Sequence, residues 1–210
     1  MTTTLILIRH GETIWNRERK LMGIMDIPLT AEGKRQAAKV ATHLRSYPLD
    51  VIFTSPLTRA LDTARKIYHF HPKIALITKN ELRERDFGSV EGFGYEEVNS
   101  IYPELIYSES WKYLHFRPKG GESLADLCIR ADKFLSVILP LYEGKNIAVV
   151  SHGTFLRVLI CRVLSLSLTD YSPLYMNNTG ITILELSKKF GGTIHAANYT
   201  AHLPDLTIAD

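Results

Sequence analysis

The sequence predicts an α/β fold, a three-layer sandwich with a mainly parallel central sheet, an antiparallel edge, helices on both faces and a small inserted helical subdomain. Three features of the chain lead to this prediction. Short apolar runs rich in β-branched residues alternate with longer segments of 3-and-4 apolar spacing, which is the pattern of a parallel sheet with covering helices. The C-terminal part carries two neighbouring strand-like runs. A segment in the middle of the chain has only weak helical periodicity.

Four apolar runs are expected to form the parallel strands. They are Leu5–Ile8, Val51–Phe53, Ile147–Val150 and, with a weaker pattern, Ile74–Ile77. Continuous apolar character over so short a length is typical of strands that are buried on both faces. Helices packed on each side of the sheet would supply that burial.

Four helices are expected around these strands. The first begins after Thr30, a good capping residue, and the second follows Pro56, which suits a first helical turn. The third opens with a capping box at Ser123 and is expected to stop at Pro140. The fourth, Phe155–Leu164, is apolar nearly all round and should therefore be deeply packed.

Two further segments complete the predicted architecture. Thr179–Ser187 and Thr193–Tyr199, joined across Lys188–Gly192, predict a hairpin added to the edge of the sheet. The stretch 87–121, rich in Tyr, Pro, Gly and Glu, is interpreted as an inserted, partly helical subdomain near the rim. Residues 1–210 are thus expected to form a single domain that contains this insert.

Composition and charge exclude several classes of protein. The 210 residues include 25 basic and 22 acidic ones, with 45% hydrophobic residues, which excludes intrinsic disorder. Two cysteines, Cys128 and Cys161, are too few for a disulfide framework or a Cys-rich zinc site, and both are expected to be small core residues. No basic stripe suits nucleic acid, and Arg157 and Arg162 interrupt the longest apolar run, which excludes a membrane span. A cytoplasmic protein is expected.

The most informative feature occurs twice. The run 5–8 leads into Arg9-His10-Gly11, and the run 147–150 leads into Ser151-His152-Gly153. Ligands of open parallel sheets bind beyond the carboxyl ends of the strands, so neighbouring strands would deliver both histidines to one crevice. The glycine after each histidine allows the backbone to turn sharply and to approach a ligand closely.

A third strand end adds a second guanidinium. Arg59 falls in the first turn after the strand 51–53 and, with Arg9, offers paired donors that match phosphate oxygens. Imidazole is nucleophilic when neutral and has an ordinary pKa of about 6.5, so one of the two rings is suited to accept a phosphoryl group. This set predicts phosphoryl transfer through a phosphohistidine, with catalysis mainly by positioning and charge neutralisation.

Such chemistry also needs a proton for the leaving alkoxide. The segment 82–88 follows the fourth predicted strand and contains Glu84, which we choose as the donor. The residues alone leave Glu81, Asp86 and Glu91 as close rivals.

Two other interpretations use the same residues. In the first, His10 and His152 are metal ligands of a hydrolase, which requires a further carboxylate or histidine at the same edge. In the second, the chain is a non-catalytic module that binds a phosphorylated ligand or a partner.

The motifs, in their order along the chain, resemble those of the histidine phosphatase superfamily, the phosphoglycerate mutase-like proteins. The resemblance covers nearly the whole chain, and its motifs are Leu7-Ile8-Arg9-His10-Gly11-Glu12-Thr13 with Trp15-Asn16, Gly23 with 26–33, Ser55–Ala60, 82–92, 120–123, 150–153 and 178–180.

The resemblance implies a role for each matched residue. His10 would be phosphorylated during turnover, and Glu84 would take the place of the proton donor. The other residues implied to act in catalysis are Arg9, Arg59 and His152. Those implied to bind the substrate are Arg9, Asn16, Gly23, Arg59, His152, Gly153 and Thr154. The resemblance implies no metal and no cofactor, and it implies a small-molecule phosphomonoester as the partner.

Two departures from the mutases of this family favour a phosphatase. Those mutases carry an Arg-Arg pair in a longer insert and usually Asn after the second His-Gly, whereas this chain has separated Lys112 and Arg117, and Thr154. We therefore expect hydrolysis of a small phosphorylated metabolite. A cofactor-dependent phosphoglycerate mutase is the alternative.

Substrate choice is expected to depend on the insert. Its aromatic residues are suited to present a wall to the substrate body, and they are Tyr95, Tyr102, Tyr107, Trp111 and Tyr113. Among the phosphatases of the family the α-ribazole type is slightly favoured over phosphoserine, sugar bisphosphate and broad-specificity types. A homodimer is left open as the oligomeric state.

Overall fold

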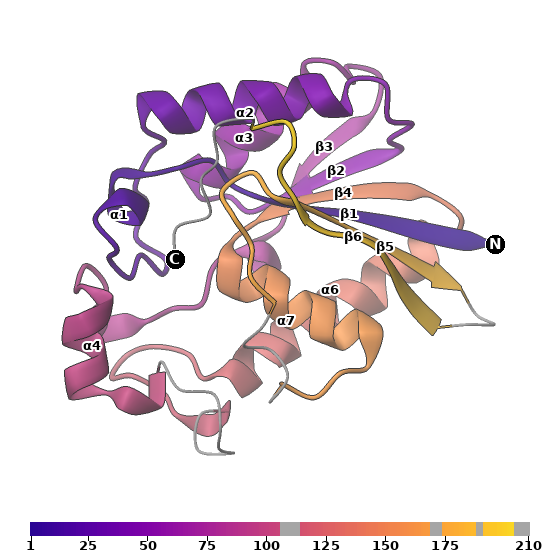
Figure 1. Cartoon of the computed structure of the whole chain (residues 1–210). Coiled ribbons are helices and arrows are strands. Elements are labelled where there is room, and N and C mark those ends of the chain that lie inside the picture. The colour runs from indigo at the N-terminus through magenta and orange to yellow at the C-terminus, as the bar shows by residue number, and fades with distance from the viewer. Residues whose placement is uncertain (106–113, 169–173, 188–190, 204–210) are drawn as a thin grey trace.

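A six-stranded sheet forms the centre of the described part of the chain. The computed structural model describes residues 1–105, 114–168, 174–187 and 191–203 (Figure 1). The strands are β1 (Thr2–Arg9), β2 (Val51–Thr54), β3 (Ala75–Thr78), β4 (Asn146–Ser151), β5 (Ile181–Ser187) and β6 (Gly191–Tyr199). Their order is β3-β2-β4-β1-β5-β6, in which the first four are parallel and the last two add an antiparallel edge. The predicted sheet is confirmed.

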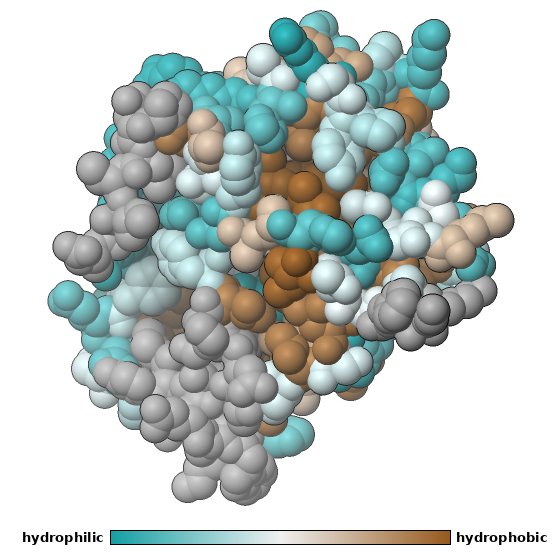
Figure 2. All heavy atoms as spheres, turned by 45° about the vertical axis from the view of Figure 1, so that its right-hand side comes forward, coloured by the Kyte–Doolittle hydropathy of each residue, from teal (hydrophilic) through white to brown (hydrophobic). Residues whose placement is uncertain are grey.

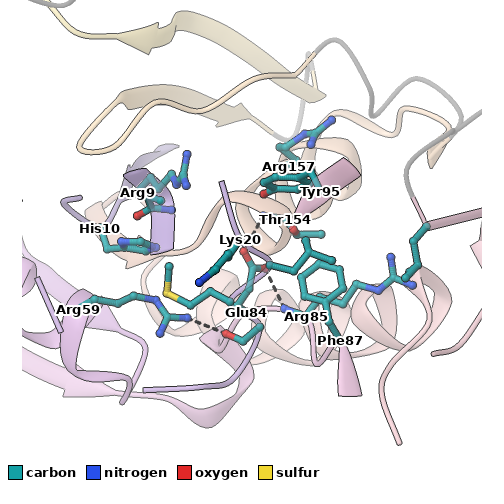
Figure 3. A pocket seen from close by; sticks show the side chains of 15 residues that line it. Arg9, His10, Lys20, Arg59, Glu84, Arg85, Phe87, Tyr95, Thr154 and Arg157 are labelled. Atoms are coloured by element: carbon teal, nitrogen blue, oxygen red, sulfur yellow. Dashed lines mark hydrogen bonds between the residues drawn. The ribbon is translucent and has the colours of Figure 1, made fainter. Parts of the chain in front are cut away.

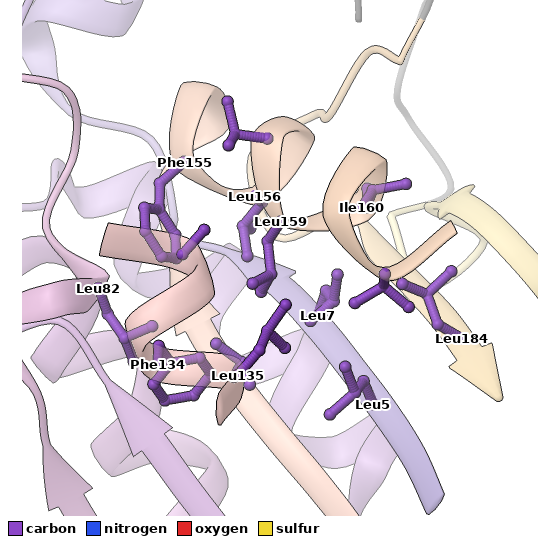
Figure 4. Packing of buried hydrophobic residues seen from close by; sticks show 14 of the residues in the cluster. Leu5, Leu7, Leu82, Phe134, Leu135, Phe155, Leu156, Leu159, Ile160 and Leu184 are labelled. Atoms are coloured by element: carbon purple, nitrogen blue, oxygen red, sulfur yellow. The ribbon is translucent and has the colours of Figure 1, made fainter. Parts of the chain in front are cut away.

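Helices cover both faces of the sheet (Figure 1). The four long ones are α2 (Ala31–Leu44), α3 (Thr58–Tyr68), α6 (Leu124–Leu141) and α7 (Gly153–Leu164). Alternate residues of β1 face opposite layers, as the two-residue period of a strand requires. Leu5 and Leu7 pack in the core with α6 and α7, part of which Figure 4 shows, whereas Ile6 and Ile8 pack in the core with α2 and α3. The three-layer prediction is therefore confirmed.

The parallel register of β1 and β4 fixes where the two predicted histidines lie. Leu5 pairs with Ile147, and the register continues until Arg9 pairs with Ser151. The residues that follow, His10 and His152, thus leave the sheet side by side at the same edge.

Local sequence explains how two of the four long helices begin. The Thr30 hydroxyl accepts a hydrogen bond from the backbone N–H of Gly33, and the predicted capping box at Ser123 is present. The second helix begins later than predicted. Its first residue is Thr58, and Pro56 lies outside it. Its N-terminus is capped from a distance by Asp26, whose carboxylate accepts bonds from the Thr58 N–H (2.7 Å) and hydroxyl (2.6 Å).

Two helix and strand ends also differ from the prediction. Pro140 lies inside α6, which continues to Leu141, so this proline is the penultimate residue of the helix and not its stop. Strand β5 begins at Ile181 and not at Thr179, because Thr179 has a φ of +57°, which lies outside the extended region of a regular strand. Strand β6 begins at Gly191, two residues before the predicted start.

The insert contains short helices packed on a small core of its own. Its described elements are the 3-10 turns η2 (Gly88–Val90) and η3 (Pro103–Leu105) and the helix α4 (Tyr95–Ile101), and the further 3-10 turn η1 (Asn80–Leu82) precedes it. Its core residues are Leu21, Phe87, Val90, Val98 and Leu105. Because Leu21 precedes α2 in the chain, the insert is packed against the loop that follows α1 (Ile14–Arg17). The predicted residues Tyr107, Trp111, Lys112 and Tyr113 lie outside the described residues.

The surface is mixed in character. Figure 2 shows one face on which polar side chains surround apolar ones. Scattered exposed apolar side chains, such as Ile129 and Leu141 of α6, are ordinary for a folded chain. Among the described residues, no helix is both long and apolar enough to cross a bilayer.

Packing between α7 and the sheet makes a stability prediction. Leu159 is fully buried there (Figure 4), so Leu159→Ala should lower the free energy of unfolding by about 3 kcal/mol, as large-to-small core substitutions do. Urea denaturation followed by circular dichroism measures this change. The exposed Leu141→Ala is the matched control and should change stability by less than about 0.5 kcal/mol. Equal effects of the two substitutions would contradict this packing.

Candidate active site

Two buried imidazoles lie together at the carboxyl ends of β1 and β4. The ring centroids of His10 and His152 are 5.1 Å apart, and the ring planes are inclined by 58°. The backbone N–H of His10 donates to the carbonyl of Ser151 (3.0 Å), which extends the strand pairing by one residue. The juxtaposition expected from the two strand-His-Gly motifs is therefore present.

Hydrogen bonding defines the tautomer of His10. Its Nδ1 lies 2.7 Å from the carbonyl oxygen of Gly11, and because a carbonyl can only accept, Nδ1 carries the proton. Nε2 then has a free lone pair. Burial, followed by the positive charges of Arg59 and Arg9, lowers the pKa of His10 well below its ordinary value. The ring is thus neutral near pH 7, with a nucleophilic nitrogen.

His152 has the opposite tautomer. Its Nδ1 accepts a hydrogen bond from Nε of Arg59 (3.2 Å), so the proton of the neutral ring is on Nε2. Burial, followed by the positive charge of Arg59, lowers the pKa of His152 well below its ordinary value. Its Nε2 is buried and has no hydrogen-bond partner among the described residues. A bound oxygen atom would satisfy this donor.

Arg59 joins the histidine pair to the loop that follows α1. Its Nη1 and Nη2 donate to the carbonyls of Met25 and Gly23, both at 2.7 Å, and its Nε donates to His152. The side chain is fully buried, and this burial lowers its pKa to about 10, so the guanidinium remains charged near pH 7. Three of the five N–H groups of a guanidinium are thus used, and two are left for a ligand.

Arg9 and Asn16 provide further donors at the same edge. Nη1 of Arg9 donates to the carbonyl of Met176 (2.6 Å), while its buried Nε has no partner among the described residues. The side-chain oxygen of Asn16 accepts bonds from the Thr13 N–H (3.0 Å) and from the side chain of Asn178 (3.2 Å). The amide nitrogen of Asn16 is therefore the atom that remains for a ligand.

Glu84 sits at the N-terminus of α7. Its Oε1 accepts bonds from the N–H groups of Arg85 (2.8 Å) and Phe155 (3.1 Å), and its Oε2 accepts from Thr154 (3.0 Å). The carboxyl group is thus held in place at the N-terminus of α7 by three backbone N–H groups. One lone pair of Oε2 remains for a substrate.

The rival acids lie elsewhere. Glu81 forms a surface ion pair with Lys133 (3.0 Å), and Asp86 binds the backbone N–H of Gly88 (2.8 Å). Glu91 binds backbone N–H groups of Ile24 and Phe87, and burial raises the pKa of its carboxyl. Of the four acids, only Glu84 lines the cavity described next.

A cavity of about 280 Å³ opens between the sheet edge and the insert (Figure 3). Residues predicted for the site that line it are Arg9, His10, Asn16, Gly23, Arg59, Glu84 and Thr154. Gly153 lines an adjoining hollow of about 390 Å³, and the buried His152 lies behind the cavity wall. The cavity is small and strongly positive, which suits a compact anion.

Several lining residues were missed by the sequence reasoning. Lys20 and Arg157 add two positive charges, and Leu21, Met22, Phe87 and Leu105 add apolar area. Helical spacing could have found Arg157, since it lies one turn beyond Gly153 on α7. No local signal marks Lys20, which reaches the cavity because its backbone pairs with Gly94 of the insert.

Two residues of the predicted aromatic wall, Tyr95 and Tyr102, lie among the described residues, and one of them lines the cavity. Tyr95 lines the cavity, and although almost half of the side chain is exposed, burial of its hydroxyl end raises the pKa of Tyr95. Tyr102 instead packs against Phe116 inside the insert, with ring centroids 5.5 Å apart. Within the described part of the chain, no three His, Cys, Asp or Glu side chains are grouped as a metal site requires.

A family model described as the histidine phosphatase superfamily (branch 1) matches residues 5–200. The chain belongs to the histidine phosphatase superfamily. The enzymes of this superfamily that the chain resembles include both phosphatases and phosphoglycerate mutases. The fold and the family predicted from the motifs are therefore confirmed.

Relatives of three kinds show the range within the superfamily. The 2,3-bisphosphoglycerate-dependent phosphoglycerate mutase 2 of Gloeobacter violaceus is 35% identical over 167 residues, 78% of this chain and 76% of that protein. A mutant phosphoserine phosphatase from Entamoeba histolytica, solved in complex with phosphoserine, is 33% identical with a TM-score of 0.85 and covers 96% of this chain and 99% of its own. The α-ribazole phosphatase from Shigella flexneri is 27% identical with a TM-score of 0.82, covering 93% and 96%.

Because His10 and His152 are buried in the neutral form, the free energy of unfolding should depend on pH. Exposed imidazoles in the unfolded chain have a pKa of about 6.5, so below that pH the unfolded chain binds protons that His10 and His152 do not bind when folded. The free energy of unfolding should therefore fall as the pH falls below about 6.5. His202, whose pKa is lowered to about 4 by burial and by His43, acts in the same direction.

Urea denaturation at several pH values between about 5 and 8 measures this slope. His152→Asn removes one of these groups and should reduce the slope by up to about 1.4 kcal/mol per pH unit. His69→Asn, which replaces an exposed histidine by the same residue, is the matched control. An unchanged slope in His152→Asn would contradict the neutral, buried state of that ring.

Proposed function

We propose that the chain is a metal-independent phosphomonoester phosphatase that acts through a phosphohistidine on a small phosphorylated metabolite. The observation that carries this proposal is the protonation pattern of the histidine pair. The Nε2 lone pair of His10 is available beside the cavity, while His152 and the guanidiniums of Arg9 and Arg59 supply donors around it. This is a nucleophile surrounded by groups that bind a phosphoryl dianion.

The first half of the reaction transfers the phosphoryl group to the enzyme. The unused N–H groups of Arg59, the Nε2–H of His152 and the amide of Asn16 hold its oxygens. Nε2 of His10 attacks phosphorus, and the bond from phosphorus to the ester oxygen breaks. Glu84, carrying a proton on Oε2, gives it to the leaving alkoxide, so an alcohol departs.

The second half releases inorganic phosphate. The carboxylate of Glu84 accepts a proton from a water molecule, whose oxygen attacks the phosphorus of the phosphohistidine. The N–P bond breaks, and His10 regains its neutral form with the Nε2 lone pair. Since neither half requires a metal ion, EDTA should leave the activity unchanged.

Two features support hydrolysis over mutase activity. The residue after the second His-Gly is Thr154, and its backbone N–H is held by Glu84. Arg117 of the insert is paired with Asp126 at 2.7 Å and does not line the cavity. The 35% identity to a phosphoglycerate mutase keeps mutase activity as the second candidate.

The cavity favours an acidic substrate body. Besides the phosphate-binding groups, Lys20 and Arg157 add positive charge to the cavity and to the adjoining hollow. A compact substrate with a second acidic group, such as phosphoserine, fits these features, and the relative solved with phosphoserine supports this choice. The α-ribazole phosphate favoured from the sequence has a larger and less acidic body, and it is kept as the competing substrate.

The proposed phosphohistidine at His10 leads to the first functional prediction. His10→Ala should abolish hydrolysis of both p-nitrophenyl phosphate and phosphoserine, because no other group can accept the phosphoryl group. Acid-quench trapping with a ³²P-labelled substrate should give an acid-labile label in the wild type and none in His10→Ala. The exposed His69→Ala is the control and should retain both activity and label.

The same assay tests the competing functions. Rapid isomerisation of 3-phosphoglycerate with 2,3-bisphosphoglycerate, without release of phosphate, would establish a mutase. Phosphate binding without turnover of any phosphomonoester would establish a non-catalytic module.

The role of Glu84 makes a separate prediction. Glu84→Gln keeps an acceptor oxygen for the helix N–H groups but has no proton to donate, so kcat on phosphoserine should fall by about 100-fold or more. The loss on p-nitrophenyl phosphate should be far smaller, because p-nitrophenolate leaves without a proton. Glu81→Gln, on the surface, is the control. Equal losses on both substrates would rule out the proton-donor role.

A further inference from the structure

The guanidinium of Arg59 is oriented by a loop and not by an acid. Its Nη1 and Nη2 donate to the carbonyls of Met25 and Gly23, while charged side chains contribute no hydrogen bond to it among the bonds found in the described part. The direction of its remaining N–H groups thus depends on where the loop 23–25 holds these two carbonyls. Whatever fixes this loop also fixes Arg59.

Glu91 fixes the loop from the insert. Its Oε1 accepts a hydrogen bond from the backbone N–H of Ile24 (2.9 Å), the residue between the two carbonyls that hold Arg59. The same oxygen accepts from the N–H of Phe87 (3.1 Å), which belongs to the insert itself. One carboxylate oxygen thus bridges the insert and the loop.

The absence of a side chain at Gly23 leaves room for the carboxylate of Glu91. It has a φ of +52°, and a Cβ atom at this position would lie 1.8 Å from Oε1 of Glu91 and 2.5 Å from its Cδ. A side chain at position 23 would therefore displace Glu91 as well as strain the backbone. The cavity-lining glycine and the acid on the insert are matched to each other.

Backbone bonds beside this contact hold the two segments together. Leu21 donates to the carbonyl of Phe93 (2.9 Å), and Gly92 donates to the carbonyl of Leu21 (2.8 Å). On the other side of the loop, Asp26 is held by the N-terminus of α3. Residues 23–25 lie between these two anchors, and Glu91 contacts the middle of that interval.

We propose that Glu91 is a positioning residue for Arg59, acting through the loop 23–25 as a hydrogen-bond acceptor. This rests on the proposed function only in that Arg59 binds the phosphoryl group. Glu91 does not touch the substrate, and its negative charge is not required for the effect. The insert thereby sets the phosphate-binding geometry as well as the substrate side of the cavity.

The experiment compares Glu91→Ala with Glu91→Gln. Glu91→Ala should weaken binding of inorganic phosphate, measured by isothermal titration calorimetry, by about tenfold. It should also lower kcat/KM on p-nitrophenyl phosphate by about 10- to 100-fold, as small misplacements of a binding group do. Glu91→Gln keeps the acceptor oxygen and should stay within about threefold of the wild type, since a side-chain amide oxygen accepts the same N–H groups. Asp86→Ala, which removes another carboxylate bonded to backbone of the insert, is the control and should bind phosphate normally.

A double-mutant cycle separates positioning from a general structural effect. Arg59→Lys removes the paired hydrogen bonds from the guanidinium to the carbonyls of Met25 and Gly23. In this background, adding Glu91→Ala should weaken phosphate binding by less than about threefold. A full additional loss in that background would overturn the proposal. Equal losses in Glu91→Ala and Glu91→Gln at unchanged thermal stability would also overturn it, as would wild-type phosphate binding by Glu91→Ala.

A second variant keeps the proposal testable if Glu91→Ala does not fold. Gly23→Ala should displace Glu91 and weaken phosphate binding by about tenfold. Gly120→Ala carries a similar backbone strain, at a φ of +77°, but its Cβ would meet no atom within 4 Å, and it should bind phosphate normally. Equal phosphate affinities of these two variants would overturn the proposal. Phosphate binding is measured directly, so these experiments test the role of Glu91 even if the chain does not hydrolyse phosphomonoesters.

Discussion

The parallel pairing of β1 with β4 is the constraint on which the site depends. It ends both strands at the same level, so two imidazoles leave the sheet within 5.1 Å of each other, under helices on both faces. Both rings are buried at this position, and two positive charges there would repel each other and the nearby guanidiniums. Both rings are therefore held neutral, and their tautomers are set by the nearest fixed partners, the carbonyl of Gly11 and the Nε–H of Arg59. The fold thus produces a nucleophile by burial and not by an adjacent base.

The buried charge of Arg59 explains much of the surrounding structure. A guanidinium without water is costly unless its N–H groups are paired, and here the partners are two loop carbonyls and an imidazole. Using carbonyls and not a carboxylate leaves the positive charge uncancelled for a ligand. The loop that supplies them must then be held by other groups, namely the carboxylates of Asp26 and Glu91, which bind backbone N–H groups. Neither carboxylate forms a hydrogen bond with the guanidinium among the described residues, because each binds backbone N–H groups instead.

The sequence was sufficient for the parts of the molecule that follow from local patterns. Buried strands such as Leu5–Ile8 have an unbroken apolar signal. The nearness of His10 and His152 followed from the two strand-His-Gly motifs and the geometry of parallel sheets. Other features depend on contacts distant in the chain. The late start of α3 at Thr58 follows from a cap supplied by Asp26, thirty-two residues earlier, and the place of Lys20 at the cavity follows from pairing with Gly94. Such contacts leave no periodicity in the sequence that could be detected.

The competition between acids illustrates the same limit and also its physical resolution. Glu84 and Glu91 lie seven residues apart, and both accept backbone N–H bonds, so neither composition nor spacing distinguishes them. What separates them is the element that each one binds. Glu84 binds the first N–H groups of α7, which begins directly beside His152, so its second oxygen reaches the cavity. Glu91 binds a loop whose carbonyls already face Arg59, so its oxygen is turned away from the ligand and towards the backbone. In the proposed mechanism, two acids on one segment are therefore divided between proton transfer and support of the phosphate site. One of them faces a helix end that opens on the cavity, and the other faces the loop that holds Arg59.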